Sequence, residues 1–156
     1  MENQTILAKK VIVFQLNDEE YAISVQQVGS IERMQKITRV PRTANFVKGV
    51  INLKGIVTPV IDLRTRFGIE PIDFQDATRI IIVYMEDMEV GLIVDAANDV
   101  LDIPESAIEP APEVVGVVDI DYIEGVAKLE NRLLILLNLQ KVLSRDEMDE
   151  LHSVEG

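Results

Sequence analysis

Few residues in this sequence could carry out covalent chemistry. The chain has one histidine, His152, in the polar C-terminal tail, and no cysteine that could act as a nucleophile beside it. Gly49 and Gly55 are too isolated to form a glycine-rich loop that binds phosphate. The sequence therefore argues against nucleophilic catalysis and against nucleotide binding.

Carboxylates are the remaining candidates, because they can hold a divalent cation. Asp95, Asp99 and Asp102 are spaced to share one face, and Asp119 and Asp121 form a minimal pair. In a chain with 27 acidic residues, such spacings occur more often as solvated edges than as metal sites. We predict that the protein is not an enzyme and needs neither metal nor cofactor. A regulatory enzyme that uses the first cluster with a metal is the alternative.

Residues 49–63 are typical of two buried strands followed directly by a helix. Lys54 and Gly55 form the turn between the strands, since glycine accepts the positive φ of a short hairpin connection. Asp62 stands at the N-cap position, and Gly68 stands where the helical turn should end.

The same stretch occurs a second time, at residues 125–139. Aligned without a gap, Gly125 matches Gly49, Asn138 matches Asp62, and the turn occupies the same place. Chance similarity between two strands would preserve hydrophobicity, but hardly the glycine, the turn and the cap together. We interpret this stretch as an internal repeat.

Each copy of the repeat is preceded by a hairpin, at residues 11–25 and 79–94, with β-branched strands around a polar turn. After each hairpin apolar residues recur at intervals of three: Val25, Val28 and Ile31, then Val94, Ala97, Val100 and Ile103. Such a stripe either covers the barrel beneath it or lines a groove between the halves. The spacing alone does not distinguish these two roles.

Two halves of this size are too small to bury a secure core separately. We therefore predict an all-β fold of two similar small five-stranded SH3-like barrels packed together, with short connecting and C-terminal helices. The chain forms a single domain, 1–156, with subdomain 1 at about 9–69 and subdomain 2 at about 77–138. Residues 139–151 form a helical segment that packs back on one barrel, with a Ser-x-x-Glu capping box at 144–147.

The charge balance restricts the class of partner. Acidic residues outnumber basic ones 27 to 15, which gives a formal net charge of -12. Nonspecific binding to nucleic acid or to an anionic membrane surface is disfavoured, since attraction to phosphate dominates both. No apolar run is long enough to span a bilayer, and the N-terminus does not resemble a signal peptide. We expect a cytoplasmic protein whose partners are other proteins.

The central motif resembles that of the CheW-type chemotaxis coupling proteins. The similarity is strongest at residues 47–55 and 59–63, and it includes residues 19–23 of the opening hairpin, the Val28-x-x-Ile31 spacing and the Pro-Ala-Pro at 110–112. It covers nearly the whole chain. The resemblance implies the same double-barrel fold and an adaptor without chemistry of its own.

Such an adaptor bridges the cytoplasmic tips of chemoreceptors to the histidine kinase CheA, and it is recruited to membrane-bound receptor clusters through these partners. The resemblance implies that the receptor's helical hairpin lies in the groove between the barrels and that the kinase's regulatory domain meets barrel ends. The implied receptor-binding residues are Val28, Ile31, Glu32, Asn52, Lys54, Gly55 and Val100. The implied kinase-binding residues are Val40, Pro41, Arg42, Pro110 and Pro112.

One position departs from the family pattern. Family members usually carry Arg where Lys54 stands, and many carry Glu where Ser30 stands. Lysine lacks the planar fork that binds a carboxylate through two hydrogen bonds. The nearest acid here is Glu32, so an equivalent ion pair is either rewired or absent.

A different kind of signalling complex offers the alternative function, an SH3-like module that recognises a proline-rich peptide. That mode needs a groove lined by aromatic side chains. The chain has no Trp, four Phe and three Tyr, and several of these fall in predicted strands, where they belong to the core.

Overall fold

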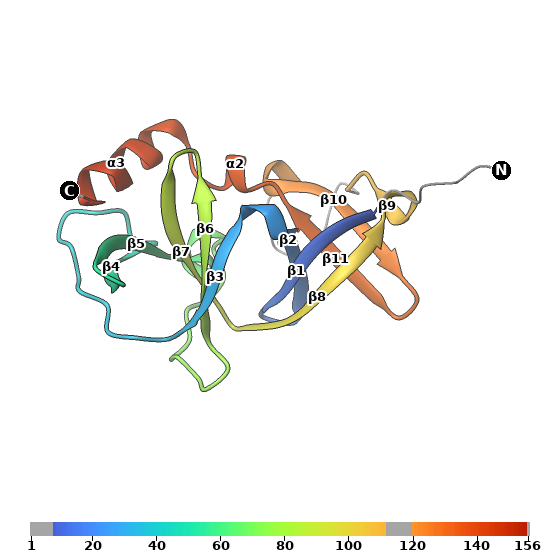
Figure 1. Ribbon diagram of the computed structural model, residues 1–156, viewed down its shortest axis with the longest axis horizontal. Coiled ribbons are helices and arrows are strands. Elements are labelled where there is room, and N and C mark those ends of the chain that lie inside the picture. Colours follow the sequence, from blue (N-terminus) through green and yellow to red (C-terminus); the bar gives the residue numbers. More distant parts are fainter. Residues whose placement is uncertain (1–7, 112–119, 156) are drawn as a thin grey trace.

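The structure is a computed structural model that describes residues 8–111 and 120–155. Its strands are β1 (Ala8–Leu16), β2 (Glu19–Ser24), β3 (Val28–Arg33), β4 (Val47–Leu53), β5 (Ile56–Asp62), β6 (Arg79–Met85), β7 (Met88–Val94), β8 (Ala96–Pro104), β9 (Ile108–Glu109), β10 (Ile123–Leu129) and β11 (Arg132–Leu137) (Figure 1). Its helices are α1 (Leu63–Arg66), α2 (Leu139–Val142) and α3 (Arg145–Glu155), with 3-10 turns η1 (Val25–Gln27), η2 (Glu105–Ala107) and η3 (Ile120–Tyr122). The predicted all-β fold with short helices is confirmed. Within the described ranges, no helix has the length and apolar composition that crossing a bilayer requires.

The strands form two separate sheets. Barrel 1 is the five-stranded sheet, in the order β3-β6-β7-β5-β4. Barrel 2 is the six-stranded sheet, in the order β8-β1-β2-β11-β10-β9, and it has one strand more than predicted. An antiparallel bridge between Thr38 and Val50 brings the segment after β3 against β4, on the other side of barrel 1.

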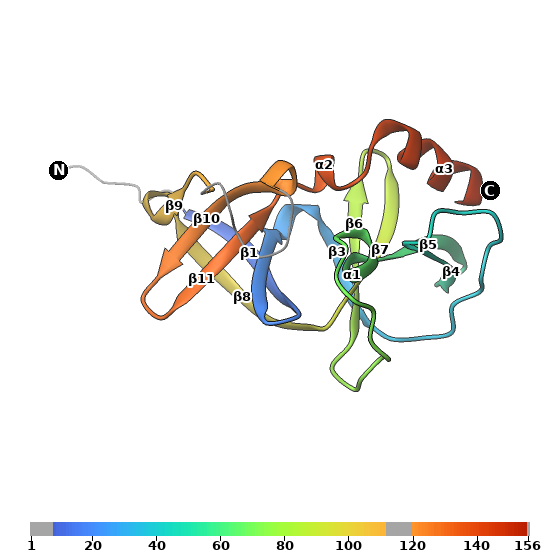
Figure 2. The same cartoon turned by 180° about the vertical axis from the view of Figure 1, so that it is seen from behind.

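The predicted division into subdomains at about 9–69 and 77–138 is wrong. The opening hairpin β1–β2 lies in barrel 2, between β8 and β11, and the hairpin β6–β7 lies in barrel 1, between β3 and β5. Each half of the repeat therefore gives its hairpin to the barrel completed by the other half. Figures 1 and 2 show the dark blue start of the chain among the yellow and orange strands of barrel 2.

The exchange follows the rough two-fold symmetry of the repeat. In the parallel ladder between β5 and β7, Val60 pairs with Gly91. In the parallel ladder between β11 and β2, Leu136 pairs with Ala22. Since Leu136 matches Val60 in the repeat, the two ladders occupy equivalent places in the two barrels. Each ladder joins a strand of one half to the exchanged hairpin of the other.

The buried side chains form three groups, one inside each barrel and one between the barrels. The interior of barrel 1 is formed by Ile51, Val60, Ile80, Ile82 and Ile93. The interior of barrel 2 is formed by Val11, Val13, Ala22, Ile103, Ala127, Leu134 and Leu136. The shared core between the barrels includes Ile12, Phe14, Tyr21, Ile61, Phe67, Ile81, Val83, Leu92, Ile135 and Leu137. Because side chains alternate along a strand, central strands such as β1 and β6 are apolar on both faces and supply a barrel interior and the shared core at once.

The predicted capping box is confirmed, and the predicted C-terminal helical segment is divided into two helices, α2 and α3, by Leu143 and Ser144. Ser144 Oγ accepts a hydrogen bond from Glu147 N at 3.1 Å, and Glu147 Oε1 accepts one from Ser144 N at 2.7 Å. Met148 and Leu151 of the following helix are buried in the shared core. The helix packs against β5, so the C-terminal segment returns to barrel 1.

Candidate binding surfaces

β3 is an edge strand of barrel 1 and β8 is an edge strand of barrel 2, and Figure 1 shows both on the side turned to the reader. Cross-strand partners in an antiparallel sheet project to the same side. Val28 pairs with Val83 and Ile31 pairs with Ile81, and both partners belong to the shared core. Val28 and Ile31 therefore project toward barrel 2.

Val100 projects from the opposite side. It pairs with Ile12, another residue of the shared core, so its side chain is directed toward barrel 1. Val100 is 58% exposed and Ile31 is 41% exposed, whereas Val28 is half-buried. We call these three apolar residues, which project from the two barrels toward the shared core, the apolar seam. Of the two roles left open for the stripe, the structure favours a surface between the halves.

Glu32 does not belong to the seam. It pairs with Ile80, whose side chain lies inside barrel 1, so Glu32 projects from the face of β3 opposite to that of Ile31. Beyond β3, the antiparallel bridge between Thr38 and Val50 directs the chain along β4. No ion pair between Glu32 and Lys54 is found in the described part of the chain.

The β4–β5 turn has the predicted form. Lys54 and Gly55 both have positive φ, of 53° and 88°, and the Oδ1 atom of Asn52 accepts a hydrogen bond from Gly55 N at 2.7 Å. Lys54 is exposed. Ile56 and Val57, which follow the turn and were predicted to lie in a buried strand, are 54% and 45% exposed. An exposed aliphatic pair beside a rigid cationic turn is a second candidate surface.

The predicted kinase-binding residues lie on two connecting segments. Val40, Pro41 and Arg42 lie between β3 and β4, where Arg42 has a φ of 65° and Val40 O accepts a hydrogen bond from a nearby threonine. Pro110 directly follows β9 and is exposed. Pro112 lies outside the described residues.

Two of the three carboxylates in the alternative metal cluster are paired with arginines. Asp95 binds Arg64, and Asp99 Oδ2 lies 3.0 Å from Arg132 Nη2, which also binds Glu20. Among the described residues, the ligand atoms of Asp95, Asp99 and Asp102 do not gather within reach of one cation. Asp119 lies outside the described residues.

One grouping of possible metal ligands does occur elsewhere. Ligand atoms of Glu86, Asp87 and His152 lie within 4.8 Å of one another. The two acidic residues are exposed, and His152 Nε2 is 3.7 Å from Asp87 Oδ1. Exposed acidic groups of this kind are common on a protein of this charge.

Most of the aromatic side chains lie in the core. Phe14, Tyr21 and Phe67 are buried in the shared core, where Phe14 stacks on Tyr21 at a centroid distance of 5.7 Å. Phe46 is also buried, and the guanidinium of Arg66 lies over its ring. The two strongly exposed aromatic residues, Phe74 and Tyr84, lie on different segments, the linker before β6 and β6 itself. This distribution argues against the SH3-like alternative, which requires a groove lined by aromatic side chains.

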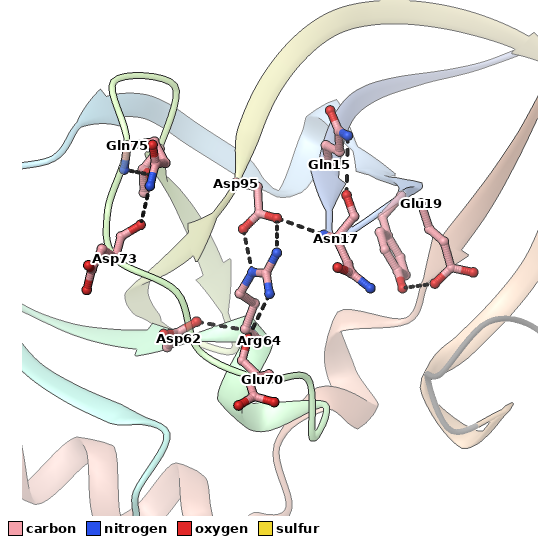
Figure 3. A network of polar contacts seen from close by, with 11 residues as sticks. Gln15, Asn17, Glu19, Asp62, Arg64, Glu70, Asp73, Gln75 and Asp95 are labelled. Atoms are coloured by element: carbon pink, nitrogen blue, oxygen red, sulfur yellow. Dashed lines mark hydrogen bonds and ion pairs between the residues drawn. The ribbon is translucent and has the colours of Figure 1, made fainter.

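A buried charged pair near α1 was not foreseen from the sequence. Arg64 donates from Nε to Asp95 Oδ1 at 2.8 Å, from Nη2 to Asp95 Oδ2 at 2.7 Å, and from Nη1 to the carbonyl of Glu70 at 2.7 Å (Figure 3). These hydrogen bonds to Asp95 raise the pKa of the Arg64 guanidinium above its ordinary value. The two residues are 31 positions apart and belong to no local motif, so no sequence signal identified them.

Asp62 caps α1 as predicted, through a 3.0 Å hydrogen bond from Arg64 N, and it is only 4% exposed. Burial raises the pKa of the Asp62 carboxyl, against the opposing effects of the Arg64 N–H and the charge of Lys48. The folded state therefore binds this proton more tightly than the unfolded state does. Its contribution to stability is present below the ordinary aspartate pKa and is lost as pH rises through the raised pKa of the folded state.

We predict that Asp62→Asn is at least as stable as the wild type at pH 7, with a smaller advantage at pH 4. Asparagine keeps the capping acceptor without the buried charge, as Asn138 does when it caps α2 through Gln140 N at 3.1 Å. The urea midpoint of both proteins at the two pH values measures this. Asp62→Ala is the control, since loss of the cap should cost about 1 kcal/mol at either pH. A loss in Asp62→Asn that equals the loss in Asp62→Ala would contradict the prediction.

Comparison with known proteins identifies the family. The CheW-like domain matches residues 10–147. The chain is 52% identical over 138 residues to the chemotaxis protein CheW of Bacillus subtilis, with 88% of each protein covered. It is 35% identical over 142 residues to that of Klebsiella aerogenes, which covers 91% of this chain and 86% of the relative.

The fold agrees with a solved structure of the same family. The crystal structure of the scaffolding protein TtCheW from Thermoanaerobacter tengcongensis matches with a TM-score of 0.83 and 38% identity, over 90% of this chain and 96% of that one. This similarity confirms the predicted pair of SH3-like barrels. The family consists of scaffolds without catalytic activity, in agreement with the shortage of catalytic residues. The chain belongs to the CheW family of chemotaxis scaffolding proteins.

Proposed function

We propose that this protein couples the cytoplasmic tips of chemoreceptors to the regulatory domain of the histidine kinase CheA. The apolar seam carries the proposal. It presents Ile31 and Val100 at 41% and 58% exposure on edge strands of two different barrels. An apolar strip between two rigid walls suits the apolar face of a helix, which is how helices are recognised in grooves.

The kinase contact is proposed for a different part of the molecule. The segment at Val40, Pro41 and Arg42, between β3 and β4, belongs to barrel 1 and does not include seam residues. Ile56 and Val57, at the start of β5, add exposed apolar area on the same barrel. Two separate surfaces allow both partners to bind at once, as a coupling protein requires. Through them the protein is recruited to membrane-bound receptor clusters.

Ile31→Glu should weaken binding to an isolated receptor tip by about 30-fold or more, because it places a charge in the centre of an apolar contact. Binding to the isolated kinase regulatory domain should stay within about twofold of the wild type. The measurement is a titration of each partner against each variant. Since Ile31 is 41% exposed, the fold itself should lose no more than about 1 kcal/mol.

The matched control is Ile72→Glu. Ile72 is the same residue type at a similar exposure, 44%, but it lies in the linker before β6, beside Lys48 and Asp62. It should leave both titrations unchanged. Equal losses in Ile31→Glu and Ile72→Glu would refute the seam as the receptor site. Lys54→Glu tests which partner the β4–β5 turn contacts. We expect weaker binding to the receptor tip without loss of stability. A loss of kinase binding alone would assign Lys54 to the kinase surface instead.

A further inference from the structure

The two barrels are joined by three passages of the chain, and one of them is held by a charged pair. β2 leads into β3 through η1, β7 leads into β8, and β11 leads into α2 and α3. Asp95 is the single residue between β7, in barrel 1, and β8, in barrel 2. A rotation of one barrel against the other must therefore change the backbone at or close to Asp95.

Asp95 is bound from both barrels. From α1, beside barrel 1, Arg64 makes the two hydrogen bonds described above. From the β1–β2 turn of barrel 2, Asn17 N donates to Asp95 Oδ2 at 2.7 Å (Figure 3). The backbone N–H of Asp95 also donates to the carbonyl oxygen of Gln15, in β1, at 2.9 Å. The side chains of Arg64 and Asp95 are only 10% and 20% exposed, so solvent screens this ion pair less than a surface pair.

These contacts differ in kind from those of the shared core. Apolar burial stabilises contact between the barrels but is not directional, so it constrains their relative angle only through shape. A two-point hydrogen bond between a guanidinium and a carboxylate has a fixed planar geometry. Asn17 binds the Asp95 carboxylate from barrel 2 and Arg64 binds it from the side of barrel 1. The fixed geometry of these hydrogen bonds therefore constrains the angle between the barrels.

The symmetry-related place in the molecule has no such pair. In the two equivalent ladders, Leu136 corresponds to Val60 and Ala22 corresponds to Gly91. Four residues further along each segment, Gln140 corresponds to Arg64 and Gln26 corresponds to Asp95. Among the described residues, the hydrogen bonds at these two glutamines are made by their backbone N–H groups. Gln140 instead lines a cavity of about 480 Å³. The two sides of the barrel interface therefore differ: one side has a directional ion pair, and the equivalent positions on the other side are neutral glutamines.

We propose that Arg64 and Asp95 form a clamp that fixes the angle between the barrels and thereby presets the distance between the β3 and β8 sides of the apolar seam. Val100 lies on β8, the strand that begins directly after Asp95, and Ile31 lies on β3 in the other barrel. Turning β8 about Asp95 moves Val100 relative to Ile31. The role in receptor binding rests on the proposed function, and Arg64 and Asp95 act in it as positioning residues.

The angle between the barrels can be measured directly, because the chain contains no cysteine. Gln35→Cys and Asn131→Cys place one spin label in each barrel at exposed positions. Pulsed electron paramagnetic resonance then gives the distribution of distances between the labels. We expect a narrow distribution in the otherwise wild-type protein and a broader or shifted one in Asp95→Asn and in Arg64→Lys, which keeps the charge but loses the fork.

The matched control is Asp99→Asn. Asp99 also lies on β8 and also pairs with an arginine, but Arg132 belongs to barrel 2 as β8 does, so this pair does not join the barrels. It should leave the distance distribution unchanged. Receptor-tip binding should fall about fivefold in the clamp variants, because only part of the population then holds the competent angle. Kinase-domain binding, on one barrel, should not change.

An unchanged distance distribution in both clamp variants overturns the proposal. So does a broadened distribution without loss of receptor binding, since the clamp would then not set the seam. If Arg64 and Asp95 only stabilise the fold, receptor binding and kinase binding should weaken equally, and that result would also count against the clamp. If the wild-type protein does not bind the receptor tip, the proposed function fails, and the distances alone still decide whether the pair fixes the angle.

Discussion

Gly49→Ala should destabilise the fold by about 3 kcal/mol or more, an expected loss that combines backbone strain with overpacking. Gly49 has a φ of +144°, which L side chains rarely adopt. A methyl group there would lie only 2.1 Å from the carbonyl oxygen of Thr38. That carbonyl accepts the hydrogen bond from Val50 N at 2.9 Å, so it cannot move without breaking the bridge beside β4.

The other glycines provide graded controls for this prediction. Gly125, the equivalent in the second copy, would place a methyl group 2.8 Å from Glu109 O without an unusual φ, so Gly125→Ala should cost about 1 to 3 kcal/mol. Gly55 has a φ of +88° with nothing within 4 Å, so Gly55→Ala should cost about 1 kcal/mol. Urea unfolding of the three variants measures the order. A Gly49→Ala protein within 1 kcal/mol of the wild type would mean that the bridge moves freely.

This pair of glycines explains why the repeat was visible in the sequence. At each, a closing segment passes too close to the strand for a side chain, at Thr38 in barrel 1 and at Glu109 in barrel 2. The same ladder positions shift register in both copies, after Val47 and after Ile123. The caps at the ends of the copies, on the other hand, are local hydrogen bonds. Features that depend on a few neighbouring residues could therefore be predicted correctly.

The exchange of hairpins could not be predicted in the same way. Strands β1 and β6 carry unbroken apolar runs and are buried on both faces. Judged by hydrophobicity alone, either hairpin could therefore complete either barrel. Which sheet a hairpin joins depends on pairings between distant residues, such as Leu136 with Ala22, and sequence periodicity carries no information on these.

At the candidate sites too, local patterns were predicted from the sequence and contacts between distant residues were not. Val28 and Ile31 are three residues apart on a strand, and they share a face because the ladder shifts register between Val28 and Ser30. The repeat added Val100. Glu32 was named as the acid nearest to Ser30, and because side chains alternate along the strand it lies on the face opposite to Ile31. The Arg64–Asp95 pair was missed because an ion pair across two barrels leaves no periodic pattern.

The exchange also yields the largest expected effect on folding. Fragments 1–73 and 74–156, produced separately, should each lack a stable fold, whereas a mixture of the two should recover it. In the first fragment, β1 and β2 have lost β8 and β11, and β3 and β5 have lost the β6–β7 hairpin. The cut lies in the exposed linker, so it removes no strand pairing itself.

Amide dispersion in NMR spectra of each fragment and of the mixture measures this, with the uncut protein as control. The repeat adds one further outcome, because two copies of a single fragment can place the hairpin of each copy in the barrel of the other, as the two halves do here. Sedimentation distinguishes the species that form. A folded homodimer of one fragment would reproduce the exchange between identical chains. A folded monomer of residues 1–73 would contradict the prediction, since its hairpin would then have completed the barrel of its own half.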